Sequence, residues 1–332
     1  MINKTSKMMF MIMILMSVII AVSSNSWFTI WMGMEINMMA FMPIIIEKNN
    51  LTTKESSLMY FLVQTMASML LVMSVIITSA KMNNFNTNNM LMMTALMMKS
   101  GMSPFHFWLP KTMEGLSWMN CLIMMTLQKI IPLLMMSNMI EMSNFLMMVT
   151  TLSVMIGSIG GLNQTSLRKL MAYSSISNNG WMLAAMLISE MLWITYFFMY
   201  SILTIIMTMT MNKYKIYHLN QLMNMNENNF KKLILMMNML SISGLPPMMG
   251  FLMKWMVLQA SLNLKETMMM TLLIMITLIT IYYYLRIMYS AMVMTNTETK
   301  WKIKNTFKNN KIMSINIISM MGLMLVSMII MI

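Results

Sequence analysis

Long apolar runs separated by short polar linkers fill the chain from Met8 to the C-terminus. About 20 apolar residues form a helix that crosses a hydrocarbon core of about 30 Å. The linkers are rich in Asn, Ser, Thr and Lys and leave no room for a soluble domain. We therefore predict one all-α membrane domain, residues 1–332, a polytopic bundle of about eleven transmembrane helices. The predicted spans are residues 8–25, 27–46, 56–79, 88–109, 117–137, 143–160, 168–188, 190–211, 230–262, 268–292 and 312–331.

The composition supports a membrane protein and excludes a soluble fold. Hydrophobic residues make up 58% of the chain and charged residues only 9%, against about a quarter charged in soluble domains. Methionine accounts for 63 residues, while Asp is absent and only two residues are Arg. This bias is typical of an AT-rich gene read with ATA as Met, as in animal mitochondria. Because Met is flexible and apolar, it replaces Leu at little packing cost.

Cofactor chemistry has no recognisable motif in the chain. The one cysteine, Cys121, excludes an internal disulfide and a Cys-based metal cluster. The sequence contains no G-x-G-x-x-G, no P-loop and no H-E-x-x-H, so neither nucleotide nor zinc binding is indicated. The net charge of +13 would favour nucleic acid only on a soluble domain with a basic face. We expect no cofactor, no metal and no nucleic-acid partner for this chain.

The basic residues lie mostly on one side of the predicted membrane. When linkers are assigned alternately, 16 Lys and Arg fall on the side of the N-terminus and two, Lys81 and Lys265, on the other. The positive-inside rule places the richer side inside, which for a mitochondrial product is the matrix. Eleven spans then put the C-terminus in the intermembrane space. The first span could alternatively be a cleaved signal peptide, although ten further spans follow it.

Besides the 18 basic residues assigned to the two sides, four basic residues remain within predicted spans, and one acid lies in the middle of a span. They are Glu35, Lys99, Lys129, Lys254 and Arg286. A charge at the centre of a lipid-facing helix costs about 2.5–3.5 kcal/mol or more, so such residues normally face the interior of a bundle. Arg286 lies near the end of its span, where its long side chain reaches the interface. The other four are candidate functional residues.

Two spans carry Gly and Pro together next to a lysine. The fourth contains Lys99-Ser-Gly-Met-Ser-Pro104, and the ninth contains Ser243-Gly-Leu-Pro-Pro247 followed by Lys254. Gly and Pro interrupt a helix and free backbone carbonyls, which is tolerated only against protein or a hydrated cavity. The two spans are five apart and run in opposite directions, which predicts an inverted repeat. We expect a first repeat over about 8–137, a second over about 143–292, and a last helix over about 312–331.

Several motifs, taken in order, resemble one family along the whole chain. They are Trp31-Met-Gly-Met-Glu-Ile-Asn37, Lys99-Ser-Gly-Met-Ser-Pro-Phe-His-Phe-Trp-Leu-Pro110, Gln128-Lys-Ile-Ile-Pro132, Gly161-Leu-Asn-Gln-Thr-Ser-Leu-Arg-Lys169, Ala172-Tyr-Ser-Ser-Ile176 and Ser243-Gly-Leu-Pro-Pro247. The family is that of the antiporter-like subunit 2 of mitochondrial NADH dehydrogenase, respiratory complex I, and the methionine-rich composition resembles insect members.

The resemblance implies a shortened form of a 14-helix fold and a proton-translocating subunit of NADH:ubiquinone reductase. It implies that Glu35 is the acidic partner of Lys99, Lys129 the central lysine and Lys254 the terminal lysine of a proton path. NADH, FMN, iron–sulfur clusters and ubiquinone would be bound by other subunits. The implied partners are complex I membrane subunits, notably subunits 4 and 4L, accessory subunits, and inner-membrane lipids such as cardiolipin, which the basic pair Arg168-Lys169 would contact.

One residue departs from the family pattern, and two other function classes stay open. Asn178 ends the run Ser174-Ser-Ile-Ser-Asn178, where the family has a histidine, and Asn takes up no proton near neutral pH. For His106 we expect an interfacial position beside aromatic residues more than a relay role. Glu35 and Lys99 could also form a static buried salt bridge that fixes the second and fourth spans, whereas Lys129 and Lys254 have no acidic partner within their spans. The alternatives to a proton-translocating subunit are a stand-alone cation/proton antiporter and a scaffold with a vestigial channel.

Overall fold

The computed structural model covers all 332 residues and describes residues 4–46, 50–80, 85–140, 143–223, 229–263 and 267–293. Within these ranges, the regular secondary structure consists of α-helices, and one isolated antiparallel bridge joins Ser166 to His218. The predicted all-α class is therefore confirmed for the described residues. The predicted last span, 312–331, and the lysine-rich linker before it lie outside these ranges.

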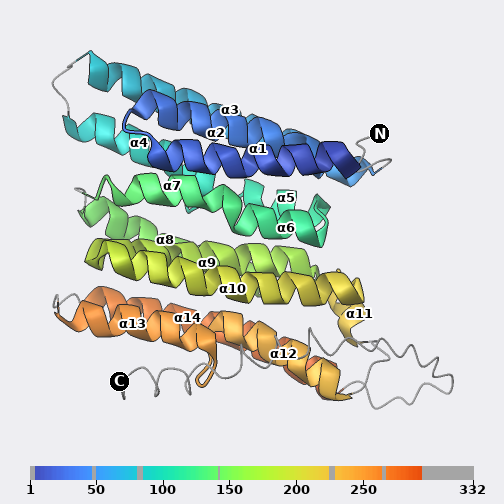
Figure 1. Cartoon of the computed structure of the whole chain (residues 1–332). Helices are drawn as coiled ribbons and strands as arrows, with labels where there is room; N and C mark the ends of the chain where they lie inside the picture. Colours follow the sequence, from blue (N-terminus) through green and yellow to red (C-terminus); the bar gives the residue numbers. More distant parts are fainter. Residues whose placement is uncertain are drawn as a thin grey trace, which may run out of the picture. The chain divides into compact units, whose positions relative to one another are not determined.

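The helices divide into two compact units, and the first comprises residues 1–149. Within it, α1 packs on α2, α2 on α3, α3 on α4 and α5, and α4 on α7 (Figure 1). Gly33 lets α1 and α2 approach closely, because a Cβ there would lie 2.9 Å from the Cβ of Ala21. The helices are α1 (Lys4–Ser23), α2 (Trp27–Ile45), α3 (Leu51–Ser79), α4 (Phe85–Ser100), α5 (Trp108–Gly115), α6 (Trp118–Met125) and α7 (Leu127–Ser137).

The second unit comprises residues 150–332, and the boundary falls inside α8. Here α10 packs on α9, α12 and α13, while α12 and α13 both contact α14. The helices are α8 (Ser143–Gly161), α9 (Leu167–Ile188), α10 (Glu190–Tyr214), α11 (Leu219–Met223), α12 (Asn229–Ser243), α13 (Met249–Asn263) and α14 (Thr267–Val293). The boundary lies close to the predicted join between the repeats, whose bounds stay a prediction.

The first ten predicted spans coincide with described helices, with one correction. The fourth span does not end at residue 109, because the helix resumes after its break as α5 and continues to Gly115. Trp108 opens α5, and its buried ring holds the new helix against the end of α4. Among the described residues, six helical segments are individually long and apolar enough to cross a membrane: 5–23, 27–45, 51–79, 118–137, 190–214 and 267–292.

The outer faces of the long helices are apolar. Side chains such as Met8, Met69 and Met268 are more than 60% exposed, and similar residues recur along α1, α3 and α14. Soluble monomers rarely expose contiguous apolar surface of this extent. These faces therefore suit contact with hydrocarbon or with other membrane helices.

Candidate functional site

The break between α4 and α5 is the first feature of the site. Gly101 adopts a left-handed φ of 72°, which glycine accepts at no steric cost, and the helix stops there. The break leaves carbonyl groups at the end of α4 without helical partners. Trp108 Nε1 donates to the Met98 carbonyl at 3.1 Å, and Gln64 Nε2 from α3 donates to the Lys99 carbonyl at 3.2 Å. Side chains thus satisfy the interrupted backbone inside the protein.

Lys99 lies in the last turn of α4 and is buried, with 7% of its surface exposed. The negative end of the helix dipole favours a cation at this position. Glu35 on α2 interacts electrostatically with Lys99 and with Tyr60. Within the described part of the chain, however, no ion pair within 4.0 Å joins the carboxylate to the amine, and Glu35 Oε1 is buried without a hydrogen-bond partner. The two groups are coupled charges and not a closed salt bridge.

A small polar cavity adjoins Lys99. Its volume is about 10 Å³, which is about the space of one water molecule. Tyr60 OH donates to Gln128 Oε1 at 3.1 Å, and Gln128 Nε2 donates to Asn37 Oδ1 at 3.0 Å. The cavity is lined by Met34, Asn37, Tyr60, Gln64, Lys99, Gln128, Ile131 and Pro132. Residues from α2, α3, α4 and α7 thus meet around one water-sized space.

Lys129 lies in the first turn of α7 and is only 2% exposed. The helix is interrupted just before it, because Thr126 has φ −116° and ψ −78° and separates α6 from α7. Thr126 Oγ1 donates to the Leu122 carbonyl at 2.8 Å, and the Lys129 amide donates to the Thr126 carbonyl at 3.1 Å. The sequence placed Lys129 at the centre of a span, but it did not reveal this interruption.

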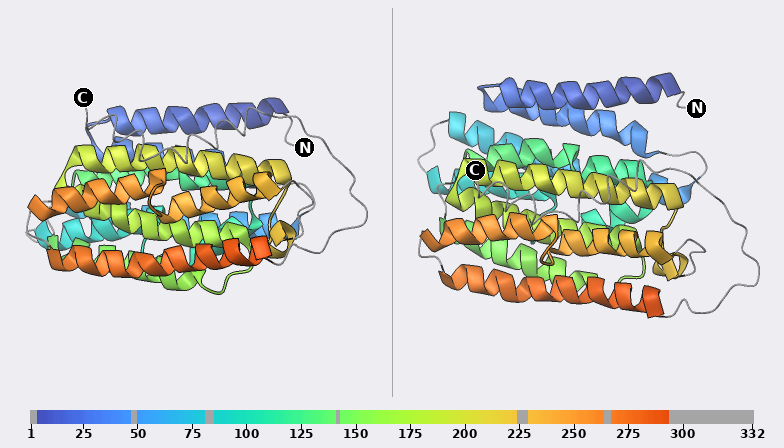
Figure 2. Two further views of the ribbon diagram at one scale, coloured as in Figure 1. Left: turned by 90° about the horizontal axis from the view of Figure 1, so that it is seen from below. Right: turned by 60° about the horizontal axis from the view of Figure 1, so that its bottom comes forward.

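The second unit contains the second predicted break, between α12 and α13, which both views of Figure 2 show. Gly244 has a left-handed φ of 87°. Lys254 Nζ donates to the Ser243 carbonyl at 2.5 Å and lies 5.9 Å from the centre of the Trp181 ring. A Cβ at Gly244 would lie 3.0 Å from Lys254 Nζ. The amine therefore caps the C-terminal end of α12, where a cation is favoured.

Asn178, at the position where the family resemblance implies a histidine, is part of a polar row on α9. Asn178 is 2% exposed and accepts a hydrogen bond from Tyr196 OH of α10 at 3.1 Å. The side chains of Tyr200 and Tyr284 lie close to Ser175 and Ser174 on the same helix. The tyrosine hydroxyls could not be paired with these residues from sequence, because the pairing depends on how α9, α10 and α14 pack.

The remaining charged candidates lie at helix ends and in loops. Arg286 is exposed and donates to the Leu162 carbonyl just beyond α8, in agreement with its predicted place outside the interior. The Arg168 guanidinium lies 4.8 Å from the centre of the Tyr217 ring. His106 is buried in the loop between α4 and α5, with Nδ1 3.1 Å from the Pro104 carbonyl oxygen, so it belongs to the break itself.

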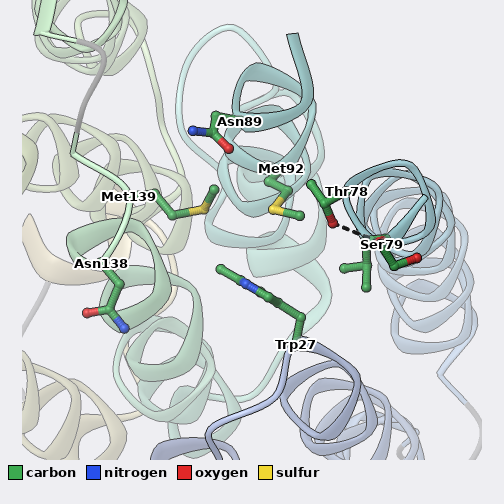
Figure 3. A pocket seen from close by; sticks show the side chains of 8 residues that line it. Trp27, Thr78, Ser79, Asn89, Met92, Asn138 and Met139 are labelled. Carbon is green, nitrogen blue, oxygen red and sulfur yellow. Dashed lines mark hydrogen bonds between the residues drawn. The ribbon is translucent and has the colours of Figure 1, made fainter. Parts of the chain in front are cut away.

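A larger groove of about 550 Å³ lies apart from these charged residues (Figure 3). It is bounded by the beginnings of α2 and α4 and the ends of α3 and α7, with Trp27 and Met92 facing into it. Its described lining residues are uncharged: Trp27, Val75, Thr78, Ser79, Asn89, Met92, Asn138 and Met139. No sequence motif indicated this groove.

Metal ligation has no support in the described ranges. No group of three or more His, Cys, Asp or Glu lies close enough there to hold an ion. Cys121 is buried in α6, where its thiol points to the carbonyls of Met113 and Leu116. The site therefore consists of ionisable side chains at helix interruptions.

Solved structures with the same fold come from respiratory and antiporter assemblies. A chain of respiratory complex I from Thermus thermophilus superposes with a TM-score of 0.82 at 19% identity, covering 96% of this chain and 78% of that one. A chain of the membrane-bound sulfane sulfur reductase, an archaeal respiratory membrane complex, gives a TM-score of 0.84 at 14% identity, covering 97% and 74%. At these identities the likeness shows the antiporter-like fold.

Sequence comparison shows the family. The profile described as NADH:quinone oxidoreductase/Mrp antiporter, TM, matches residues 24–280. The NADH-ubiquinone oxidoreductase chain 2 of Anopheles gambiae is 46% identical over 98% of both chains, and that of Aedes aegypti is 47% identical over the same share. The chain 2 of Locusta migratoria is 40% identical over 97% of this chain and 95% of its own. The chain therefore belongs to the NADH-ubiquinone oxidoreductase chain 2 family.

Proposed function

We propose that this chain is a core membrane subunit of proton-pumping NADH:ubiquinone oxidoreductase, respiratory complex I, in the mitochondrial inner membrane. It conducts protons through Glu35, Lys99, Lys129 and Lys254 and has no redox centre of its own. The observation that carries the proposal is the position of the three lysines. Each is buried and lies beside a helix interruption within one compact unit: Lys99 and Lys129 in the first, Lys254 in the second.

The geometry around Lys99 supports reversible proton binding. A buried amine holds its proton less tightly than one in water, and a carboxylate nearby restores the affinity. Because the Glu35 carboxylate is electrostatically coupled to Lys99 but not bonded to it, a small displacement of α2 or α4 changes that coupling. The cavity beside Lys99 has room for one water molecule, which can accept the proton that Lys99 releases. A closed ion pair would instead hold both charges in place.

Lys254 serves the second unit in a different way. Its amine donates to the Ser243 carbonyl, so the terminal lysine is anchored to the end of a half-helix. Asn178 accepts a hydrogen bond from Tyr196, and its amide takes up no proton itself. Proton movement through the second unit then depends on Lys254 and on water, with no histidine at position 178.

The proposal includes the finer assignments that the family resemblance implies. NADH, FMN, iron–sulfur clusters and ubiquinone are bound by other subunits, and the chain contacts other membrane subunits, notably subunits 4 and 4L. The N-terminus faces the matrix and the C-terminus the intermembrane space, which the basic linkers support. Arg168 stacks on Tyr217 beside Lys169, which suits the phosphates of cardiolipin. The alternatives are a stand-alone antiporter and a scaffold with a vestigial channel. Neither requires proton movement through this chain to be linked to quinone reduction.

The substitution Lys129→Arg tests the proposal. Arginine keeps the positive charge at any accessible pH, so it replaces a structural cation but not a proton carrier. In the assembled complex of a tractable relative, we expect normal assembly and a large loss of proton-coupled quinone reductase activity. Normal turnover with normal proton uptake would make Lys129 a structural cation. A control substitution Lys169→Arg, in the basic pair at the start of α9, should leave pumping unchanged.

A further inference from the structure

A chain of three neutral side chains links the helix of Glu35 to the helix of Lys129. Tyr60 OH of α3 donates to Gln128 Oε1 of α7, and Gln128 Nε2 donates to Asn37 Oδ1 of α2. Asn37 is two residues from Glu35, and Gln128 is adjacent to Lys129. All three members line the cavity beside Lys99. Hydrogen bonds of this kind between helices are a main specific attraction inside a membrane bundle.

The chain can exist in two hydrogen-bonded states. A phenol both donates and accepts, and each amide carries an acceptor oxygen and a donor nitrogen. In the observed state Tyr60 donates and Asn37 accepts. If the amides of Gln128 and Asn37 both turn over, Gln128 Nε2 donates to Tyr60 OH and Gln128 Oε1 accepts from Asn37 Nδ2. The hydroxyl proton of Tyr60 is then free to point into the cavity, and no bond to a buried group is lost.

The charge of Glu35 favours one state over the other. Tyr60 is within electrostatic reach of Glu35, and its hydroxyl dipole lies in that field. The two states point the hydroxyl proton in different directions, so ionising or neutralising Glu35 changes their relative stability. A change of charge at Glu35 or Lys99 thereby changes which way the Gln128 amide points. Gln128 lines the cavity beside Lys99 and is adjacent to Lys129 in sequence. A two-state element that a charge biases is the physical requirement for such coupling.

We propose that Tyr60 and Gln128 are positioning residues that transmit the charge state of Glu35 and Lys99 to Lys129. The proposal rests on the proposed function, because it requires Lys129 to carry protons. The hydroxyl is the part that matters. The ring of Tyr60 packs edge-on against Phe41, with centres 5.3 Å apart, and near Trp108 at 6.1 Å, so the packing does not need the oxygen.

The test uses Tyr60→Phe and Gln128→Leu, singly and together, in the assembled complex in sealed inner-membrane vesicles. The readouts are protons moved per NADH oxidised and the pH profile of quinone-linked turnover. We expect each single variant to assemble and to lose roughly three- to tenfold in proton-coupled turnover, the range for one buried hydrogen bond. The midpoint of the pH profile should move by roughly 0.5–1 unit, which is the same free energy. The double variant should lose no more than either single one.

Phe41→Leu is the matched control, because it removes the ring that packs on Tyr60 and leaves the hydrogen bonds intact. It should lower stability without changing the pH profile. Wild-type pumping and an unchanged profile in Tyr60→Phe, or independent losses that multiply in the double variant, would overturn the proposal. If Lys129→Arg fails while Tyr60→Phe pumps normally, only this inference is wrong. If both pump normally, the proposed function itself is wrong.

Discussion

Replacing Gln64 by Leu removes the side chain that satisfies the broken end of α4. Gln64 is 6% exposed, and its amide donates to the Lys99 carbonyl at 3.2 Å. Leucine fills much of the same space but has no donor, so the carbonyl is left buried without this partner. Such a loss costs about 1–3 kcal/mol. We therefore expect the free energy of local opening around Gly101 to fall by about 1–3 kcal/mol.

The assay is amide hydrogen exchange of the peptide that contains Gly101 and Met102, measured in the assembled complex. The Met102 amide donates to the Met97 carbonyl at 3.1 Å and reports on the break directly. When exchange follows the opening equilibrium, 1–3 kcal/mol corresponds to about 5- to 150-fold faster exchange.

Ser68→Ala is the matched control on the same helix. Ser68 is also buried, but its hydroxyl bonds only within α3, to the Thr65 carbonyl at 2.8 Å. This variant should leave exchange around Gly101 unchanged. If Gln64→Leu exchanges like Ser68→Ala, the amide does not stabilise the break, and the account of how α4 ends is wrong.

Three further predictions concern the second unit and the whole chain. Lys254→Met and Lys254→Arg should both stop proton transport. Only the methionine variant should increase hydrogen exchange at the end of α12, by roughly tenfold or more, because methionine cannot donate to the Ser243 carbonyl. Protease added to the matrix face of inner-membrane vesicles should cut the linker 296–311, and cleavage from the other face would contradict the span count. The chain isolated from its complex in detergent should show no flavin or iron–sulfur absorbance, and such a spectrum arising from this chain would refute the absence of redox centres.

The sequence predicted the membrane spans from their apolar residues and two helix interruptions from their Gly and Pro residues. A single apolar segment inside a membrane satisfies its backbone hydrogen bonds only as a helix. The first ten predicted spans accordingly coincide with described helices. Gly101 and Gly244 adopt positive φ at the two interruptions that Gly and Pro indicated. The interruption at Thr126 was missed because no glycine marks it. The only nearby signal is Pro132, which lacks an amide to donate to the Gln128 carbonyl.

The candidate site was predictable in its charges but not in its contacts. Glu35, Lys99, Lys129 and Lys254 stood out because a charge inside a span is costly. Gln64, Tyr60 and Asn178 carry no charge, and polar side chains of this kind are common at interfaces between membrane helices. Their roles depend on the register of one helix against another, which the periodicity of a single span does not fix. The structure was needed to show that Gln64 meets the Lys99 carbonyl and Tyr60 meets Gln128.

The hydrogen bond from Lys254 to the Ser243 carbonyl links the position of the end of α12 to proton binding at Lys254. A charged donor binds a carbonyl more strongly than a neutral one, so the order of this helix end depends on whether the amine is protonated. Linkage is reciprocal, and a force that pulls α12 away from α13 changes proton binding at Lys254 by the same free energy. If Lys254 carries protons, as we propose, a neighbouring protein that moves α12 away from α13 would weaken proton binding at Lys254 and favour release of its proton.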